Sequence, residues 1–165
     1  MIFGRYQTEI GEAQGTPLLA GTTLLGQEFQ LEPATVLIMG WNFHHLASWE
    51  IWWKLLFSEF PQSRRFHMGF ITGNYERRHL AVLDQCVPQS RHTRTCLWRD
   101  PEQEWMKWAF WQDKHEVLTT LVRGDGSALY MKGLPTEDAW ELFSREFNRE
   151  IILWNSRQAA PKPGA

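Results

Sequence analysis

The sequence predicts an α/β domain in three layers, with a mixed central sheet of about five strands and flanking helices. The apolar run at 34–41 is typical of a strand buried on both faces, and a helical segment at 49–60 and a second strand at 65–72 follow it. Strand, helix and strand in this order form a right-handed unit with parallel strands. The dipeptide Asp125-Gly126 lies between two later apolar runs and predicts an antiparallel hairpin.

Length and composition are those of one ordinary globular domain. A chain of 165 residues buries roughly 68–70% of its unfolded surface without disulfides or a structural metal. Apolar residues make up 43%, charged residues make up 22%, and the net charge is −2, which argues against wholesale disorder. We expect a single domain over residues 1–155 and a disordered tail over 156–165, because SRQAAPKPGA offers little to bury.

The first elements can be placed from periodicity. In TTLLGQEFQLEP, Phe29 and Leu31 alternate with polar residues, which predicts an edge strand or hairpin arm. Ser48 is the expected cap of the helix at 49–60, and Pro61 is expected to end it. This helix is apolar nearly all round, so it must be covered on more than one side.

The middle of the chain alternates in the same way. The strand at 65–72 is followed by a helix at 75–87, which Asn74 would cap, and then by a basic stretch containing a strand at 95–98. Asp100 at the cap and Pro101 at the first helical position predict a further short helix.

The last third contains the strongest signals. Strands at 116–123 and 127–132 flank the hairpin turn, and Thr136 caps a long helix. The positions expected to face the core of this helix recur at helical spacing: Ala139, Phe143, Phe147, Ile151 and Trp154.

Two stretches resemble the ends of the thioredoxin-like superfamily. They are LLAGTTLLGQEFQLEPATVLIMGW and LTTLVRGDGSALYMKGLPTEDAWELFSREF, and the pattern from Asp125 to Trp140 is the more specific part. The likeness covers about residues 18 to 153 and is nearer the peroxiredoxin and TlpA-type branches than thioredoxin itself. It implies the thioredoxin-like sandwich but says little about function, since one fold serves many chemistries.

The sequence departs from this superfamily at two functional positions. The resemblance places the reactive cysteines in the loop at 41–48, but this loop contains no cysteine. Family oxidoreductases also have a cis-proline before the hairpin, whereas this chain reads Asp113-Lys114-His115-Glu116-Val117-Leu118. Thiol–disulfide exchange requires a thiolate, so the usual chemistry is absent from this loop.

We therefore expect a protein-binding site, with no catalytic residue, no metal site and no cofactor. Its predicted residues are Asn42, Phe43, His44, His45, Trp49, Trp52 and Trp53. Metal binding or acid–base catalysis by His44 or His45 is a weaker alternative, because adjacent side chains point apart and no partnered nucleophile is visible.

The two cysteines provide an alternative function. Cys86 and Cys96 are ten positions apart, which matches no CxxC pair and no zinc pattern. If the nearby arginines converge on Cys96, they would lower its pKa, and Cys86 could then act as the resolving thiol. This alternative is a thiol–disulfide oxidoreductase or peroxidase; the other interpretation is that both thiols are buried or idle.

The chain has ten tryptophans, and their aromatic surface is larger than a sheet of about five strands would readily bury. Either some of them cover a partner or a second copy, or the core is rich in tryptophan. The stretch RHTRTCLWR could contact nucleic acid, but it is short and the chain is net negative, so we interpret it as a solvated loop.

The sequence therefore favours a non-catalytic binding protein: an assembly factor, a chaperone-like adaptor or a subunit of a larger complex. Its partner would be another protein or a second copy of the chain. The opening residues MIFGRYQTEIGEAQG lack the pattern of a secretory signal, and no run is long enough to span a membrane. We therefore expect a cytoplasmic protein without membrane insertion.

Overall fold

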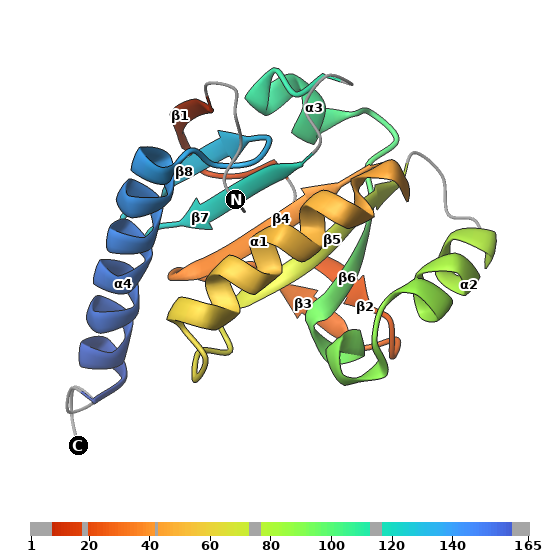
Figure 1. The fold of residues 1–165 in the computed structure, drawn as a ribbon, viewed down its shortest axis with the longest axis horizontal. Coiled ribbons are helices and arrows are strands. Elements are labelled where there is room, and N and C mark those ends of the chain that lie inside the picture. Colours follow the sequence, from red (N-terminus) through yellow and green to blue (C-terminus); the bar gives the residue numbers. More distant parts are fainter. Residues whose placement is uncertain (1–7, 18–19, 42, 73–76, 113–116, 160–165) are drawn as a thin grey trace, which may run out of the picture.

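The computed structural model describes residues 8–17, 20–41, 43–72, 77–112 and 117–159. Eight strands form one sheet in the order β1-β8-β7-β4-β5-β6-β2-β3 (Figure 1). Their bounds are β1 Glu9–Gln14, β2 Ala20–Thr23, β3 Glu28–Gln30, β4 Thr35–Gly40, β5 Phe66–Thr72, β6 Thr95–Arg99, β7 Leu118–Val122 and β8 Ser127–Lys132. The helices are α1 Leu46–Glu59, α2 Arg77–Cys86, α3 Glu104–Ala109 and α4 Glu137–Ala159.

The centre of the sheet confirms the predicted strand–helix–strand unit. Strand β4 pairs parallel with β5 on one side and antiparallel with β7 on the other. Every residue of β4 is buried, as expected for a strand with neighbours on both edges and layers on both faces. Strand β6 continues the parallel part beside β5.

The sheet is wider than the five strands expected from the sequence. Five predicted strands correspond to β8, β7, β4, β5 and β6, and the edge strand or hairpin arm predicted around Phe29 is confirmed as β3, which pairs with β2. The structure adds β1 beyond β8 and β2 between β6 and β3. The residues of β1 are exposed or half-buried, and the strand has no alternation of apolar and polar residues. Backbone pairing with β8 holds it in place. Sequence periodicity could not reveal a strand of this kind.

The helices divide unequally between the two faces. Residues of α1, α2 and α4 pack with Val36, Ile38 and Met68 in one apolar cluster. On the opposite face, α3 packs with Leu37, Met39 and their neighbours. No helix within the described ranges is long and apolar enough to cross a membrane.

Helix α1 begins earlier than its predicted cap. Its N-cap is His45, and Ser48 is a buried residue inside the first turns, so the assignment of Ser48 as the cap was wrong. The helix ends at Glu59, ahead of Pro61, as predicted. Helix α1 packs against both the sheet and the neighbouring helices, so its apolar residues are covered on more than one side. The sequence predicted this cover, because the helix is apolar nearly all round.

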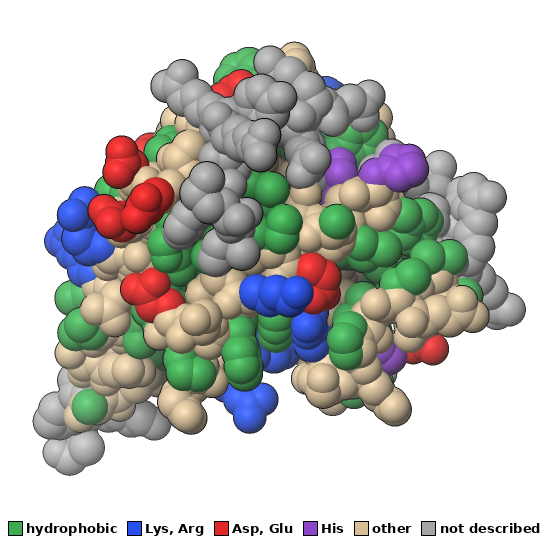
Figure 2. Space-filling view, in the orientation of Figure 1, with side chains coloured by type: hydrophobic (Ala, Val, Ile, Leu, Met, Phe, Trp, Pro, Cys, Tyr) green, Lys and Arg blue, Asp and Glu red, His purple; other side chains and the backbone are tan. Residues whose placement is uncertain are grey.

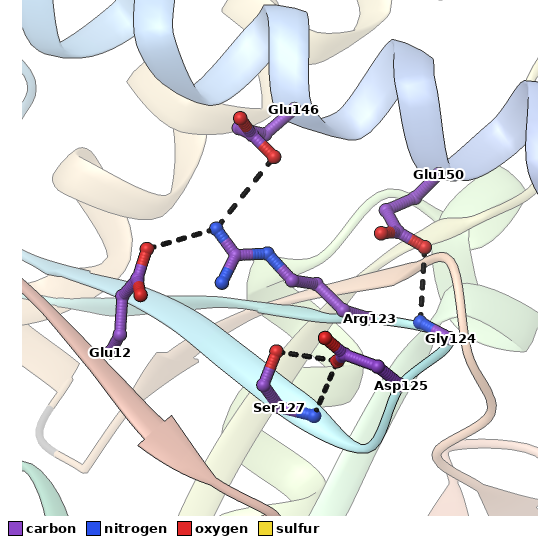
Figure 3. A network of polar contacts seen from close by, with 7 residues as sticks. All are labelled: Glu12, Arg123, Gly124, Asp125, Ser127, Glu146 and Glu150. Carbon is purple, nitrogen blue, oxygen red and sulfur yellow. Dashed lines mark hydrogen bonds and ion pairs between the residues drawn. The ribbon is translucent and has the colours of Figure 1, made fainter.

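The β7–β8 hairpin is fastened to α4 through the network in Figure 3. Gly126 has a φ of 87°, which suits glycine at the turn. The Glu150 carboxylate accepts a hydrogen bond from the Gly124 amide at 3.0 Å, and Arg123 reaches both Glu12 on β1 and Glu146 on α4. These contacts join the first strand, the hairpin and the last helix.

Helix α4 extends further than the sequence indicated. The Thr136 hydroxyl accepts the Ala139 amide at 3.3 Å, which confirms the predicted cap. Residues 156–159 are helical, so the expectation of a disordered tail from Ser156 was wrong for these positions. They continue the hydrogen-bonded ladder of a helix that is already anchored by packing. Residues 160–165 lie outside the described ranges.

Candidate functional site

A small cavity lies where the three parallel strands end. Trp41 follows β4, Thr72 ends β5 and Asp100 follows β6, and the parallel pairing brings these positions to one edge of the sheet. They line a cavity of about 180 Å³, which we call the carboxyl-edge pocket; its remaining walls are Phe70, Ile71, Gln103 and Met106. This edge is where open α/β sheets bind ligands.

Asp100 fixes one wall of the carboxyl-edge pocket. Its amide donates to the Thr72 carbonyl at 2.7 Å, and its carboxylate accepts the amides of Glu104 at 2.8 Å and Trp105 at 3.0 Å. Helix α3 therefore begins at Glu104, with Gln103 at a φ of 54° as the cap, rather than at Pro101 as predicted. A turn comes between the capping carboxylate and the helix, but the carboxylate still satisfies the first free amides.

Two residues that line the carboxyl-edge pocket each have an unsatisfied polar atom. Trp41 Nε1 and Thr72 Oγ1 are both buried, and neither has a hydrogen-bond partner among the residues that the structure describes. Leaving such a group unpaired costs about 1–3 kcal/mol, so folded proteins rarely retain one without a reason. A ligand with one acceptor and one further polar atom could satisfy both.

The loop before α1 forms a short 3₁₀ turn, Phe43–His45, beside the pocket. His45 is 5% exposed, and its Nδ1 accepts the Trp41 amide at 3.2 Å. The ring therefore holds its proton on Nε2. Trp111 completes an aromatic cluster, with its ring centroid 6.0 Å from those of both Trp41 and His45. In this cluster His45 positions the loop.

The other predicted loop residues are placed differently. His44 is exposed, so the adjacent histidines do point apart. Phe43 is half-buried and stacks on Phe70, with ring centroids 5.1 Å apart. Asn42 lies outside the described residues. Within the ranges that the structure covers, no three His, Cys, Asp or Glu side chains are grouped as metal ligands would be.

The predicted binding tryptophans form part of the core. Trp49 and Trp52 are 0% exposed and Trp53 is 6% exposed, so the expectation that they form a contact surface was wrong. Trp52 Nε1 donates to the Gly133 carbonyl at 3.0 Å, and Trp49 lies against Gly40, where an added Cβ would come 2.9 Å from its ring. The wide sheet and three helices on one face provide the cover that a smaller sheet would lack.

Solved structures resemble this architecture at low sequence identity. A SCO1/SenC family lipoprotein from Bacillus anthracis str. Ames matches with a TM-score of 0.56 and 13% identity over 84% of this chain and 95% of its own. A putative thiol:disulfide interchange protein DsbE from Chlorobium tepidum matches with a TM-score of 0.53 and 12% identity over 86% and 99%. The chain has the thioredoxin-like fold. No family model matches it, and no curated protein matches it by sequence.

These comparisons also correct the expected location of the thioredoxin-like chain. We expected a cytoplasmic protein from the residues at the start of the sequence, but one of the matching structures is a lipoprotein. Lipid attachment holds a protein at a membrane surface, so the comparison contradicts the expectation. The expectation depended on two absences in the sequence, a secretory signal pattern and a membrane-spanning run, which are weak support.

The cysteines of this thioredoxin-like chain lie in contrasting settings. Both are free, Cys86 exposed at the end of α2 and Cys96 buried in β6. Burial raises the pKa of the Cys96 thiol to about 12, so the expected lowering by nearby arginines was wrong. Cys96 belongs to the cluster on the α3 face, whereas the Arg94 guanidinium lies over Trp53 and Phe66 on the opposite face. The family's cis-proline position falls on residues 113–116, outside the described ranges.

The loop before α1 could be predicted from the sequence, but the pocket beside it was not predicted. Thr72 and Asp100 had not been singled out for function, although each stands at the end of a predicted parallel strand. Comparing the last residues of neighbouring strands would have identified them, because such ends converge at one edge.

Proposed function

We propose that this thioredoxin-fold chain is a non-catalytic binding protein, an assembly factor or adaptor, that holds a segment of a partner protein at the carboxyl-edge pocket. The supporting observation is that two residues lining that cavity, Trp41 and Thr72, each have a buried polar atom, Nε1 and Oγ1, without a hydrogen-bond partner among the described residues. The loop in the position of the family's reactive cysteines contains no thiol, which supports recognition over thiol exchange at this position.

The size of the pocket favours a side chain as its occupant. Small-molecule sites commonly enclose about 300–1,000 Å³. The carboxyl-edge pocket encloses about 180 Å³, which suits one polar side chain of a polypeptide. Its aromatic and apolar walls, Phe70, Ile71 and Met106, would pack on the stem of that side chain while Trp41 donates to its oxygen.

Replacement of Thr72 by Val tests the proposal. The buried hydroxyl is unpaired, so Thr72→Val should leave the free energy of unfolding unchanged or raise it by about 1 kcal/mol. Peptides selected from a display library against the native chain should bind Thr72→Val at least about tenfold more weakly, the effect of one lost hydrogen bond. Urea unfolding and fluorescence anisotropy give the two measurements.

Thr119→Val is the matched control. Thr119 is also fully buried, and its hydroxyl also lacks a partner among the described residues, but it lies on β7 and does not line the pocket. It should retain peptide binding. Equal affinity of the native chain and Thr72→Val for every selected peptide would contradict the proposal.

Thiol–disulfide exchange is the second candidate, and the match to a structure described as a thiol:disulfide interchange protein favours it. Cys86 is exposed and Cys96 is buried, and both are free thiols in the structure. Iodoacetamide under native oxidising conditions separates the candidates. The binding proposal expects rapid labelling of Cys86, slow labelling of Cys96 and no intramolecular disulfide by mass spectrometry. A Cys86–Cys96 disulfide, with turnover of a dithiol or peroxide substrate, would establish the enzyme instead.

A further inference from the structure

A larger and more basic cavity lies at the opposite edge of the sheet. It encloses about 570 Å³ between the second half of α1, the loop at 61–64 and the 3₁₀ helix Gln89–Arg94, and we call it the amino-edge pocket. The loop precedes β5 and the 3₁₀ helix precedes β6, so the cavity adjoins the ends where these strands begin. Figure 2 shows Lys and Arg side chains close together in the middle of the face of the molecule that is turned toward the viewer, where Figure 1 shows α1.

Four cationic side chains line the amino-edge pocket: Lys54, Arg64, Arg91 and Arg94. No Asp or Glu is among its lining residues. Arg91 pairs with Glu50 on α1, whereas the described part of the chain offers no carboxylate within ion-pair distance of Arg64 or Arg94. The cavity therefore has an excess of positive charge that its own walls do not neutralise.

Arg94 is held rigidly by its surroundings. Its Nε and Nη2 donate to the Phe66 carbonyl at 3.1 and 2.7 Å, and its guanidinium carbon lies 4.1 Å from the centre of the Phe66 ring. Arg91 and Arg94 both lie over the Trp53 ring, at 4.8 and 4.6 Å. Such stacking fixes the planes of both groups before any ligand arrives, which lowers the entropy lost on binding.

The arginines repel one another in this arrangement. Burial, followed by the charges of Arg64 and Arg91, lowers the pKa of Arg94 to about 10. An anion placed among the three guanidinium groups would offset this repulsion, and the interaction would be stronger than in open water because Arg94 is half-buried.

We propose that the amino-edge pocket binds the phosphate group of a small phosphorylated molecule. Planar guanidinium forks match phosphate oxygens, and two serines, Ser58 and Ser90, also line the cavity and carry hydroxyl donors. The volume lies within the range of small-molecule sites, and Phe57, whose side chain is 51% exposed, offers an aromatic face at the rim for a planar ring. This site is separate from the carboxyl-edge pocket, and its existence does not depend on the proposed function.

Isothermal titration calorimetry with inorganic pyrophosphate and with AMP at low ionic strength tests the proposal. Arg64 and Lys54 are exposed, so Arg64→Gln and Lys54→Gln should leave the fold unchanged. Arg64→Gln should raise the pyrophosphate Kd about tenfold or more, and Lys54→Gln about threefold, since charge-assisted bonds of this kind are lost. Added salt should weaken binding of both probes by the native chain.

Arg149→Gln on α4 is the charge-matched control, because Arg149 is exposed and does not line the pocket. It should change the Kd by less than about twofold, as expected for a distant surface charge. Citrate tests the ligand class and should bind at least about tenfold more weakly than pyrophosphate at equal ionic strength. The proposal is overturned by absent pyrophosphate binding, by an unchanged Kd in Arg64→Gln, by an equal loss in Arg149→Gln, or by citrate binding as tightly as pyrophosphate.

Discussion

The half-buried histidine of β5, His67, gives the structure a testable acid sensitivity. The His67 ring is packed 4.5 Å from the centre of the Phe29 ring, and its Nδ1 is buried with no hydrogen-bond partner among the described residues. Burial, with the nearby charges of Arg94 and Arg65, lowers the pKa of His67 to about 3. In the folded protein this ring is therefore mainly neutral from about one pH unit above that value upward.

The sign of the effect follows from proton binding in the two states. The pKa of the unfolded chain's histidine is about 6.5, so between pH 6.5 and 3 the unfolded state binds a proton that the folded state does not. The free energy of unfolding therefore falls as the pH is lowered through this window, by about 1.4 kcal/mol per pH unit. At pH 4.5, which is about two units below the unfolded pKa, the loss is about 2.7 kcal/mol.

Urea unfolding of the native chain and His67→Phe at pH 7.5 and 4.5 measures this contribution. The loss of unfolding free energy between the two pH values should be smaller in His67→Phe by about 2.7 kcal/mol. Any packing cost of the larger ring is the same at both pH values and cancels in the comparison. The Asp125 carboxyl, whose pKa the Ser127 hydrogen bonds lower, adds acid sensitivity to both proteins and cancels too.

His44→Gln is the matched control, because it removes an exposed histidine and should keep the native acid sensitivity. Equal losses of unfolding free energy in the native chain and His67→Phe would refute the reasoning. That outcome would mean that water or a structural rearrangement solvates the protonated ring.

Three further substitutions are predicted to lower the free energy of urea unfolding. Gly40→Ala should cost about 1–3 kcal/mol, because the added methyl would come 2.9 Å from the Trp49 ring; an unchanged midpoint would show that the ring can move. Asp100→Ala should cost about 0.5–2 kcal/mol, because two amides at the start of α3 lose their acceptor; Asp100→Asn should restore part of it. Phe143→Ala should cost about 3–5 kcal/mol by forming a cavity, with a cost below 1 kcal/mol contradicting its place in the core.

The sequence predicted the elements that are specified by a local pattern of apolar residues or by a turn dipeptide. The run from Thr35 to Gly40 has apolar side chains on both faces of the strand. Its burial between two layers could therefore be predicted without knowing which strands pair with it. The Asp125-Gly126 turn predicted the β7–β8 hairpin because few other residue pairs tolerate its dihedral angles.

Features that depend on distant pairing were not predictable in this way. Strand β1 is specified by its partner β8, more than one hundred residues away in sequence, and not by any apolar pattern of its own. Because the full width of the sheet was not predicted, the number of tryptophans it could bury was underestimated. A sheet of about five strands leaves an aromatic surplus for a partner, whereas the observed sheet and helices bury Trp49, Trp52, Trp98 and Trp105 completely or almost completely. The support for self-association that came from this surplus is therefore lost.

The candidate sites show the same division between local and nonlocal information. The loop before α1 could be located because it follows a strand that is obvious in the sequence. Its role depends on side chains from elsewhere: the ring of Trp111 packs on His45, and Thr72 and Asp100 close the pocket beside Trp41. In this chain the space next to the missing thiols is filled by an aromatic cluster that fixes the loop. A small cavity with largely apolar walls, beside a loop whose Trp41 and His45 are fixed by packing, is suited to recognising one side chain, whereas disulfide exchange needs an accessible thiolate in the same place.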